Sequence, residues 1–257
     1  MVSSGRSRRR FGTGLGIALA SVALTTGCGR TSTVTTTTTY TATTTATSPA
    51  TSPKTTTPTD TGSGQSASPA TGTALAALEE LAVKGRAPKT GYSRDQFGGG
   101  WNTVAGCITR DRILARDLSE KTYVAGSMCR VQSGTLLDPY TNGTIKYIRG
   151  AGGNIDIDHV VALADAWQKG AQHWSAAKRK MFANDPLDLL AVGAAVNRAK
   201  GDGDAATWLP PNKSFRCEFV ARQIAVKHKY GLWVTGAERD AIVRVLATCP
   251  NQRLPKA

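Results

Sequence analysis

The pattern of apolar and polar positions separates a long stretch without periodicity from a later stretch in which periodic segments alternate with turns. Residues 30–73 are nearly all Thr, Ser, Pro, Ala and Gly, a composition that cannot bury a core. From residue 74 onward, apolar residues recur at helical or strand spacing. We therefore expect a solvated, disordered linker over residues 29–73 and one folded domain over residues 74–257.

Helical spacing is the commonest signal in the folded segment. Apolar residues three and four apart, with charged residues between them, predict several short amphipathic helices. Thr109 is the expected N-cap of one of them. The expected helices cover residues 74–82, 108–118, 162–181, 219–230 and 237–246.

Strand-like segments lie between these helices. Residues 130–140 and 144–148 are separated by Thr141-Asn142-Gly143, and an Asn-Gly pair is typical of a tight hairpin turn. Two further short strands are expected, one within residues 155–163 and one at the end of residues 184–192. The sequence therefore predicts an α+β domain with short strands and several helices.

The N-terminus has the pattern of an export signal. Four arginines between Arg6 and Arg10 precede an apolar stretch over residues 11–24, which is too short for a comfortable membrane span. We predict a signal peptide over residues 1–28. The run from Ser7 to Phe11 resembles a twin-arginine signal, but a Sec signal also begins with arginines, so both export routes stay open.

A cysteine follows this apolar stretch. Leu24-Thr25-Thr26-Gly27-Cys28 resembles a bacterial lipobox, although the aliphatic residue stands one place early. This resemblance implies lipidation of Cys28, and ordinary cleavage without a lipid is the alternative. The expected location is extracellular or at the cell surface, with the membrane reached only through this anchor.

Four cysteines lie in the folded segment. An even count in an exported protein indicates two disulfides, and four cysteines allow three pairings. We favour Cys107 with Cys129 and Cys217 with Cys249, because each pair lies within one compact stretch. A zinc-thiolate site is the less favoured alternative, since no close C-x-x-C pair is present.

Charge narrows the range of partners. The formal net charge is +14, and residues 76–257 carry 26 Lys/Arg against 17 Asp/Glu. A basic domain attracts polyanions, so we expect nucleic acid or an anionic envelope polymer as the partner. Nothing in the sequence indicates an obligate protein partner.

Polar residues that could take part in catalysis or bind a metal cluster in two stretches. Asp156, Asp158 and His159 lie in an alternating, strand-like segment, and the bland interpretation is a solvated Asp beside a core His. A second strand follows, and then Asn197 in a polar segment. A strand bearing Asp and His, a second strand, and an Asn on the next helix is the order of a ββα-metal nuclease site.

The same residues resemble a known motif. Asp158-His159-Val160-Val161, Asp188-Leu189 and Asn197-Arg198-Ala199-Lys200 resemble the HNH (His-Me finger) endonuclease motif. The longer run from Cys107 to Pro211 is similar to exported HNH family proteins related to the C-terminal nuclease domain of GmrSD-type restriction enzymes. This resemblance implies an HNH core within a mostly helical domain.

The resemblance also implies a reaction. His159 would act as general base on a water that attacks a phosphodiester, and Asp158 and Asn197 would hold one divalent ion and complete the catalytic set. Oxygen ligands favour Mg²⁺ first, with Mn²⁺ or Ca²⁺ as alternatives. The expected substrate is DNA, with RNA also open, cut to leave 5′-phosphate ends.

Five residues are expected to bind phosphate or to support the site. Where the HNH motif usually has Asn, this chain has Asp188, which can accept the same hydrogen bonds but, as a carboxylate, cannot donate one. Asn184 is the alternative brace for the loop that carries the base. The five residues are Asp188, Asn184, Lys200, Arg110 and Asp156.

Two other functions remain open. A binding module with the same fold would hold nucleic acid or envelope polymer without cutting it, and a different hydrolase would use the same base and metal on envelope phosphodiesters. A serine or cysteine nucleophile is disfavoured, because no G-x-S-x-G segment is present and the cysteine count in the folded segment is even.

Overall fold

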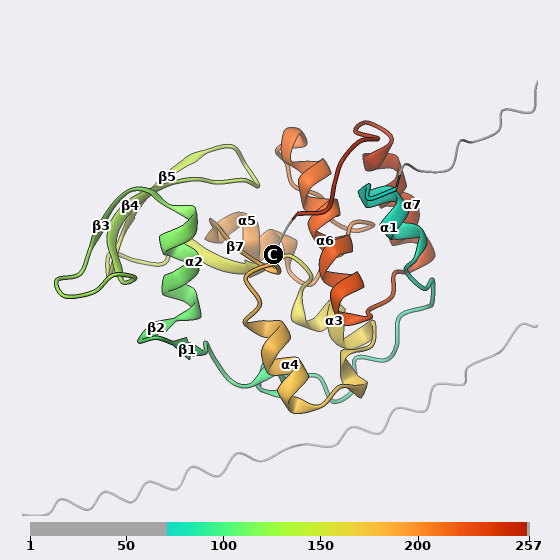
Figure 1. Ribbon diagram of the computed structural model, residues 1–257, viewed down its shortest axis with the longest axis horizontal. Helices are drawn as coiled ribbons and strands as arrows, with labels where there is room; N and C mark the ends of the chain where they lie inside the picture. Colours follow the sequence, from blue (N-terminus) through green and yellow to red (C-terminus); the bar gives the residue numbers. More distant parts are fainter. Residues whose placement is uncertain (1–70, 256–257) are drawn as a thin grey trace, which may run out of the picture. The chain divides into compact units, whose positions relative to one another are not determined.

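The structure is a computed structural model that describes residues 71–255 (Figure 1). The predicted signal peptide, the predicted lipidation site at Cys28 and nearly all of the predicted linker lie outside the described residues. Among the described residues, no helix combines the length and apolar character needed to cross a bilayer.

Within residues 71–255, seven short strands form three small antiparallel sheets. The sheets have the orders β1-β2, β3-β4-β5 and β6-β7. Their bounds are β1 Thr103–Val104, β2 Cys107–Ile108, β3 Ser119–Tyr123, β4 Val131–Leu137, β5 Thr144–Ile148, β6 Ile155–His159 and β7 Leu189–Gly193.

Seven α-helices and three 3₁₀ turns make up most of the remaining regular structure of the described part of the chain. Together with the sheets they confirm the predicted α+β class. The α-helices are α1 Ala74–Glu79, α2 Thr109–Asp117, α3 Leu163–Gln168, α4 Ala176–Ala183, α5 Ala194–Lys200, α6 Arg216–Tyr230 and α7 Gly236–Leu246. The 3₁₀ turns are η1 Arg94–Phe97, η2 Ala171–His173 and η3 Lys213–Phe215.

The structure corrects three details of the predicted elements. The single helix expected over residues 162–181 is divided into α3, η2 and α4, because Gly170 has a φ of 128° and Ser175 caps a new helix. Thr109 is not the cap of α2: Ile108 occupies that position, and the Thr109 hydroxyl donates to the Asn102 carbonyl at 3.2 Å. Strands β1, β2 and β3 were not predicted.

Both predicted disulfides are confirmed. Cys107 pairs with Cys129 at a Cα–Cα distance of 6.0 Å, and Cys217 pairs with Cys249 at 6.5 Å. The first joins β2 to the segment before β4. The second joins the start of α6 to the segment after α7. Each therefore closes one compact stretch of the chain, as the spacing suggested.

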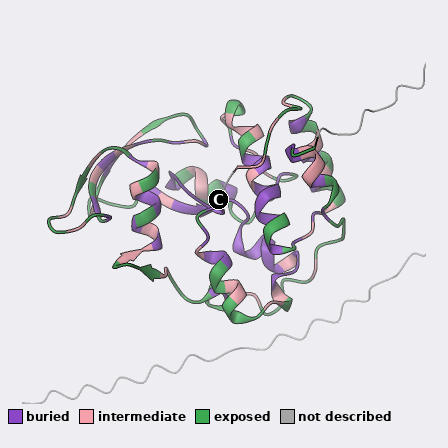
Figure 2. Cartoon of the chain, in the orientation of Figure 1, coloured by how far each residue is buried: buried purple, intermediate pink, exposed green. Residues whose placement is uncertain are grey.

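Apolar side chains of the described residues form three core clusters. One lies among α1, α6 and α7, a second around α3, α4 and the end of α6, and a third between α2 and the strands β4, β6 and β7. Figure 2 shows buried residues concentrated on α3, on β6 and β7, and along α6. All five residues of β7 are buried, so the β6-β7 pair lies in the interior of the fold.

The β6-β7 pair and α5 are one continuous unit. In the antiparallel register, Asp158 lies opposite Leu190 and His159 opposite Leu189. Helix α5 begins directly after β7 and packs against both strands. This geometry carries Asn197 and Lys200 to the acidic residues of β6.

Candidate functional site

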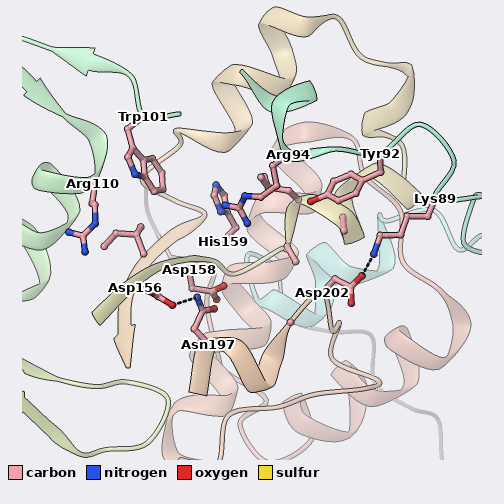
Figure 3. A pocket seen from close by; sticks show the side chains of 15 residues that line it. Lys89, Tyr92, Arg94, Trp101, Arg110, Asp156, Asp158, His159, Asn197 and Asp202 are labelled. Carbon is pink, nitrogen blue, oxygen red and sulfur yellow. Dashed lines mark hydrogen bonds and ion pairs between the residues drawn. The ribbon is translucent and has the colours of Figure 1, made fainter. Parts of the chain in front are cut away.

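A cavity of about 660 Å³ opens at the end of β6 (Figure 3). Side chains from β6, α5, the start of α2 and the segment before β1 converge on it. The charged, aromatic and amide residues that line it are Lys89, Tyr92, Arg94, Trp101, Arg110, Asp156, Asp158, His159, Asn197 and Asp202.

His159 is the last residue of β6, and its ring has a fixed orientation. Its Nε2 lies 2.9 Å from the Ala183 carbonyl, which can only accept, so Nε2 carries the proton. The other ring nitrogen, Nδ1, has no hydrogen-bond partner among the described residues and therefore presents its lone pair. Burial, together with the positive charges of Arg94 and Lys200, lowers the pKa of His159 to about 4. The imidazole is neutral at pH 7 and able to accept a proton.

Trp101 packs against this imidazole. The two rings are nearly parallel, at 9°, with their centroids 5.9 Å apart. The loop that carries Trp101 is held by Asn184, whose Oδ1 accepts from the Asn102 amide at 2.7 Å. Asn184 thus braces the loop of the stacking tryptophan, whereas its neighbour Ala183 holds His159 itself.

Asp158 is buried between two donors. The Tyr140 hydroxyl donates to its Oδ2 at 2.5 Å, and Lys200 Nζ lies 2.9 Å from its Oδ1. Lys200 also donates to the His159 carbonyl at 2.8 Å, and its side chain is 0% exposed. Lys200 therefore supports the backbone of the base and the adjacent acid. Burial raises the pKa of Asp158, and the charge of Lys200 opposes this rise.

Asp156 and Asn197 face each other within the cavity. Asn197 Nδ2 donates to Asp156 Oδ2 at 3.1 Å, and this contact joins β6 to α5 (Figure 3). Asp156 lies two residues before Asp158, on the same face of the strand. The structure thus brings together the acids, the amide and the histidine that the sequence singled out.

The donor set suits a hard cation. The described residues contain no group of three or more His, Cys, Asp and Glu positioned to hold a metal. The cavity instead combines the carboxylates of Asp156 and Asp158 with the amide oxygen of Asn197. A carboxylate has about four lone-pair sites, so Asp158 can bind an ion and keep both of its present contacts. Oxygen donors of this kind fit Mg²⁺, Mn²⁺ or Ca²⁺ better than Zn²⁺.

Asp188 braces the turn that follows His159. Its Oδ1 accepts from the Val161 amide at 2.8 Å, and its own carbonyl accepts from the Val160 amide at 2.8 Å. The side chain is fully buried, and Oδ2 has no hydrogen-bond partner within the described part of the chain. Burial raises the pKa of Asp188 well above its usual range, and the negative charge of Asp158 adds to this rise. A protonated Asp188 can donate as well as accept, as an asparagine does.

Positive charge surrounds the base. Arg110, at the start of α2, donates one bond to the Ile155 carbonyl at 3.1 Å and leaves its other guanidinium donors open. Arg94 reaches toward His159 in Figure 3 and forms no hydrogen bond or ion pair within residues 71–255. Lys89 is paired with Asp202 at 2.6 Å. The cavity therefore offers two incompletely paired guanidinium groups to an anion.

The sequence did not identify Arg94 and Trp101 as site residues. Both lie in an irregular, glycine-containing segment whose pattern gave no strand or helix periodicity. Their place beside His159 depends on long-range packing of η1 and the 98–102 loop against α3 and α4. An arginine beside an aromatic-rich loop was the one signal available.

The fold and the cavity define an α+β domain centred on a neutral histidine with acidic and amide neighbours. Residues 108–245 match the family model of the C-terminal domain of GmrSD restriction endonucleases. The chain belongs to this family, which relates it to nucleases.

One relative comes from Arthroderma benhamiae. The two chains are 41% identical over 184 residues, which cover 70% of this chain and 87% of the relative. The relative is described as an uncharacterized secreted protein. No solved structure matches the chain.

Proposed function

We propose that this protein is an exported, metal-dependent HNH endonuclease that hydrolyses DNA, and that β6, β7 and α5 form its ββα-metal core. The orientation of His159 carries the proposal. Its Nε2 is held by the Ala183 carbonyl, and its free Nδ1 belongs to a neutral, buried ring in a cavity with two arginines. This is the state that a general base requires.

Each residue then has a defined task. His159 Nδ1 accepts a proton from the attacking water, and the Trp101 stack and the Ala183 carbonyl fix the ring plane while it does so. Arg110 binds a phosphate oxygen of the substrate strand. A divalent ion, Mg²⁺ in our proposal, would be held by Asp158 and Asn197 beside Asp156, and would neutralise charge on the phosphate and the leaving 3′-oxygen.

Export rests on independent observations. The N-terminal pattern is that of a signal peptide, and the relative from Arthroderma benhamiae is described as secreted. Two disulfides fit an oxidising compartment. We propose an extracellular or surface location, with lipidation of Cys28 as its testable refinement.

Cleavage of plasmid and single-stranded DNA tests the function. We expect cleavage with Mg²⁺ or Mn²⁺, none with EDTA, and a loss of about 10²–10⁴-fold in His159→Ala. His173→Ala is the matched control, because His173 is exposed in η2 and does not line the cavity.

Three results would contradict the proposal in different ways. Equal cleavage by His159→Ala and the parent protein would show that His159 is not the general base. DNA binding that weakens with salt but never leads to cleavage would favour the binding module. Hydrolysis of an envelope phosphodiester polymer with DNA left intact would favour the other hydrolase class.

A further inference from the structure

A second hollow lies against the first, on the side of His159 that faces η1. It measures about 290 Å³ and shares Arg94, Trp101, His159 and Leu163 with the larger cavity. One water occupies roughly 30 Å³ in the liquid, so this hollow has room for a flat ring system. Anything bound in it lies directly beside His159, the proposed general base.

The floor of the hollow is apolar, and two glycines leave part of its rim open. Phe97, Leu163 and Ala183 are 1%, 6% and 6% exposed, which makes the floor part of the packed core. Gly99 and Gly100 form part of the rim, and a Cβ added at either would meet nothing within 4 Å. An apolar floor with an opening at the two glycines suits a flat aromatic ligand better than a hydrated ion.

The two charged residues at the hollow, Arg94 and Asp95, favour different parts of a ligand. Arg94 lies where the two cavities meet, and its guanidinium has no hydrogen-bonding or ion-pairing partner among the described residues. A guanidinium presents a rigid fork of donors that matches phosphate. Asp95 also lines the hollow, so a second anion would be repelled there, whereas the N–H groups of a nucleobase would find an acceptor.

We propose that Arg94 and this hollow form a subsite for one unpaired nucleotide, with the phosphate on Arg94 and the base in the hollow. The inference rests on the proposed function in taking nucleic acid as the substrate. A base that is paired within a duplex cannot enter the hollow. The enzyme is therefore expected to prefer single strands, or duplex positions where a base can leave the stack.

Binding of ligands that cannot be cleaved tests the subsite. Thymidine 5′-monophosphate and deoxyribose 5-phosphate differ only in the base, and neither contains a phosphodiester. The full-length protein is titrated with each ligand by ¹H–¹⁵N NMR, following the indole N–H of Trp101, assigned with Trp101→Phe. We expect the nucleotide to bind about tenfold more tightly than the sugar phosphate.

Two variants divide the contributions. Arg94→Gln should weaken both ligands by about tenfold, through loss of charge-assisted bonds. Gly99→Asn should abolish the advantage of the nucleotide and leave the sugar phosphate unchanged. Gly99 has a φ of +65°, which Asn tolerates. Arg112→Gln and Gly126→Asn are the controls: Arg112 is exposed on α2 outside both cavities, and Gly126 has a φ of +73° with open space around it.

Three results would each overturn the proposed subsite. They are equal affinities for the two ligands, no binding of either ligand at a concentration on the order of 10 mM, and binding that neither variant changes. These outcomes are independent of the cleavage assay. A protein that binds the nucleotide as expected but cuts no DNA would retain the subsite and lose the proposed catalytic function.

Discussion

Two groups of buried charges lie in this domain, and they are arranged differently. In the helical part, Lys169 Nζ contacts Asp165, Asp204 and Glu238 at 2.7, 2.8 and 2.7 Å, and Lys227 contacts Glu238 at 2.8 Å. Arg86 completes this helical network, with contacts of 3.0 Å to Asp165 and 2.6 Å to Asp204. Three cations face three anions, and none of these six side chains lines the cavity at β6.

The group around β6 is paired only in part. Lys200 neutralises Asp158, yet the Nδ1 of His159 and the Oδ2 of Asp188 have no hydrogen-bond partner among the described residues. The Asp188 atom is buried, and leaving such an atom unpaired costs about 1–3 kcal/mol. The helical network joins elements of the fold, whereas the β6 group keeps a proton acceptor available beside a cavity. Every cation of the helical network thus contacts at least two acids, whereas the proton-accepting nitrogen at β6 has no partner within the described residues.

The largest stability effect is expected in the helical network. Lys169→Met removes the charge that three acids share, and breaking a buried ion pair costs about 3–5 kcal/mol. We expect a corresponding fall in the free energy of unfolding, measured by urea denaturation, with unchanged DNA cleavage per folded molecule. Lys146→Met is the control, because its pair with Glu120 is exposed, and exposed ion pairs contribute little to stability. A specific loss of cleavage in Lys169→Met would mean that the helical network also serves the site.

The next largest effect is expected at β6, where a substitution should reduce cleavage more than stability. Lys200→Met leaves Asp158 with only Tyr140 as a donor and removes a bond to the His159 carbonyl. Because such supporting contacts orient the groups that hold a metal, we expect cleavage or Mg²⁺ affinity to fall by about 10–100-fold. Cleavage measured at increasing Mg²⁺ concentration distinguishes the two effects, because excess Mg²⁺ restores cleavage only where the loss is one of Mg²⁺ affinity. If Lys200→Met lost stability alone and cut DNA normally once folded, the two groups of charges would be alike.

The sequence predicted the elements better than it predicted the neighbours of the base. Apolar periodicity gave the helices at both ends of the domain and the Asn142-Gly143 hairpin. It did not give β3, whose Ser-Glu-Lys-Thr-Tyr sequence lacks an apolar alternation and whose side chains are mostly exposed. Local polarity hides a strand that is stabilised by pairing with β4.

The site residues divide in the same way into those that the sequence predicted and those that it did not. Asp156, His159 and Asn197 could be selected from one strand and one helix, because the order of elements determines their approach. Trp101 and Arg94 could not, because they reach His159 from a segment that precedes it by about 60 residues and has no regular structure around the glycines. Long-range packing of irregular segments has no short-range signature.

The smallest expected effect concerns Asp188 and depends on pH. Its pKa is raised in the folded protein, so the folded state keeps a proton that the unfolded state releases once the pH exceeds the ordinary carboxyl pKa. The stability contributed by this group is thus fully present below the unfolded pKa, and it declines as the pH rises toward the folded value. Asp188→Asn removes this proton linkage and keeps the acceptor for the Val161 amide.

Asp188→Asn should therefore be near neutral at pH 4 and stabilising by about 1 kcal/mol at pH 7, within the range for relieving a poorly paired buried group. Thermal unfolding of both proteins at the two pH values measures the difference. Asp240→Asn is the control, because Asp240 is an exposed residue of α7 outside the site. A stability difference that is the same at both pH values would show that Asp188 has the same protonation in the folded and unfolded chains, which would contradict a raised pKa of its buried carboxyl.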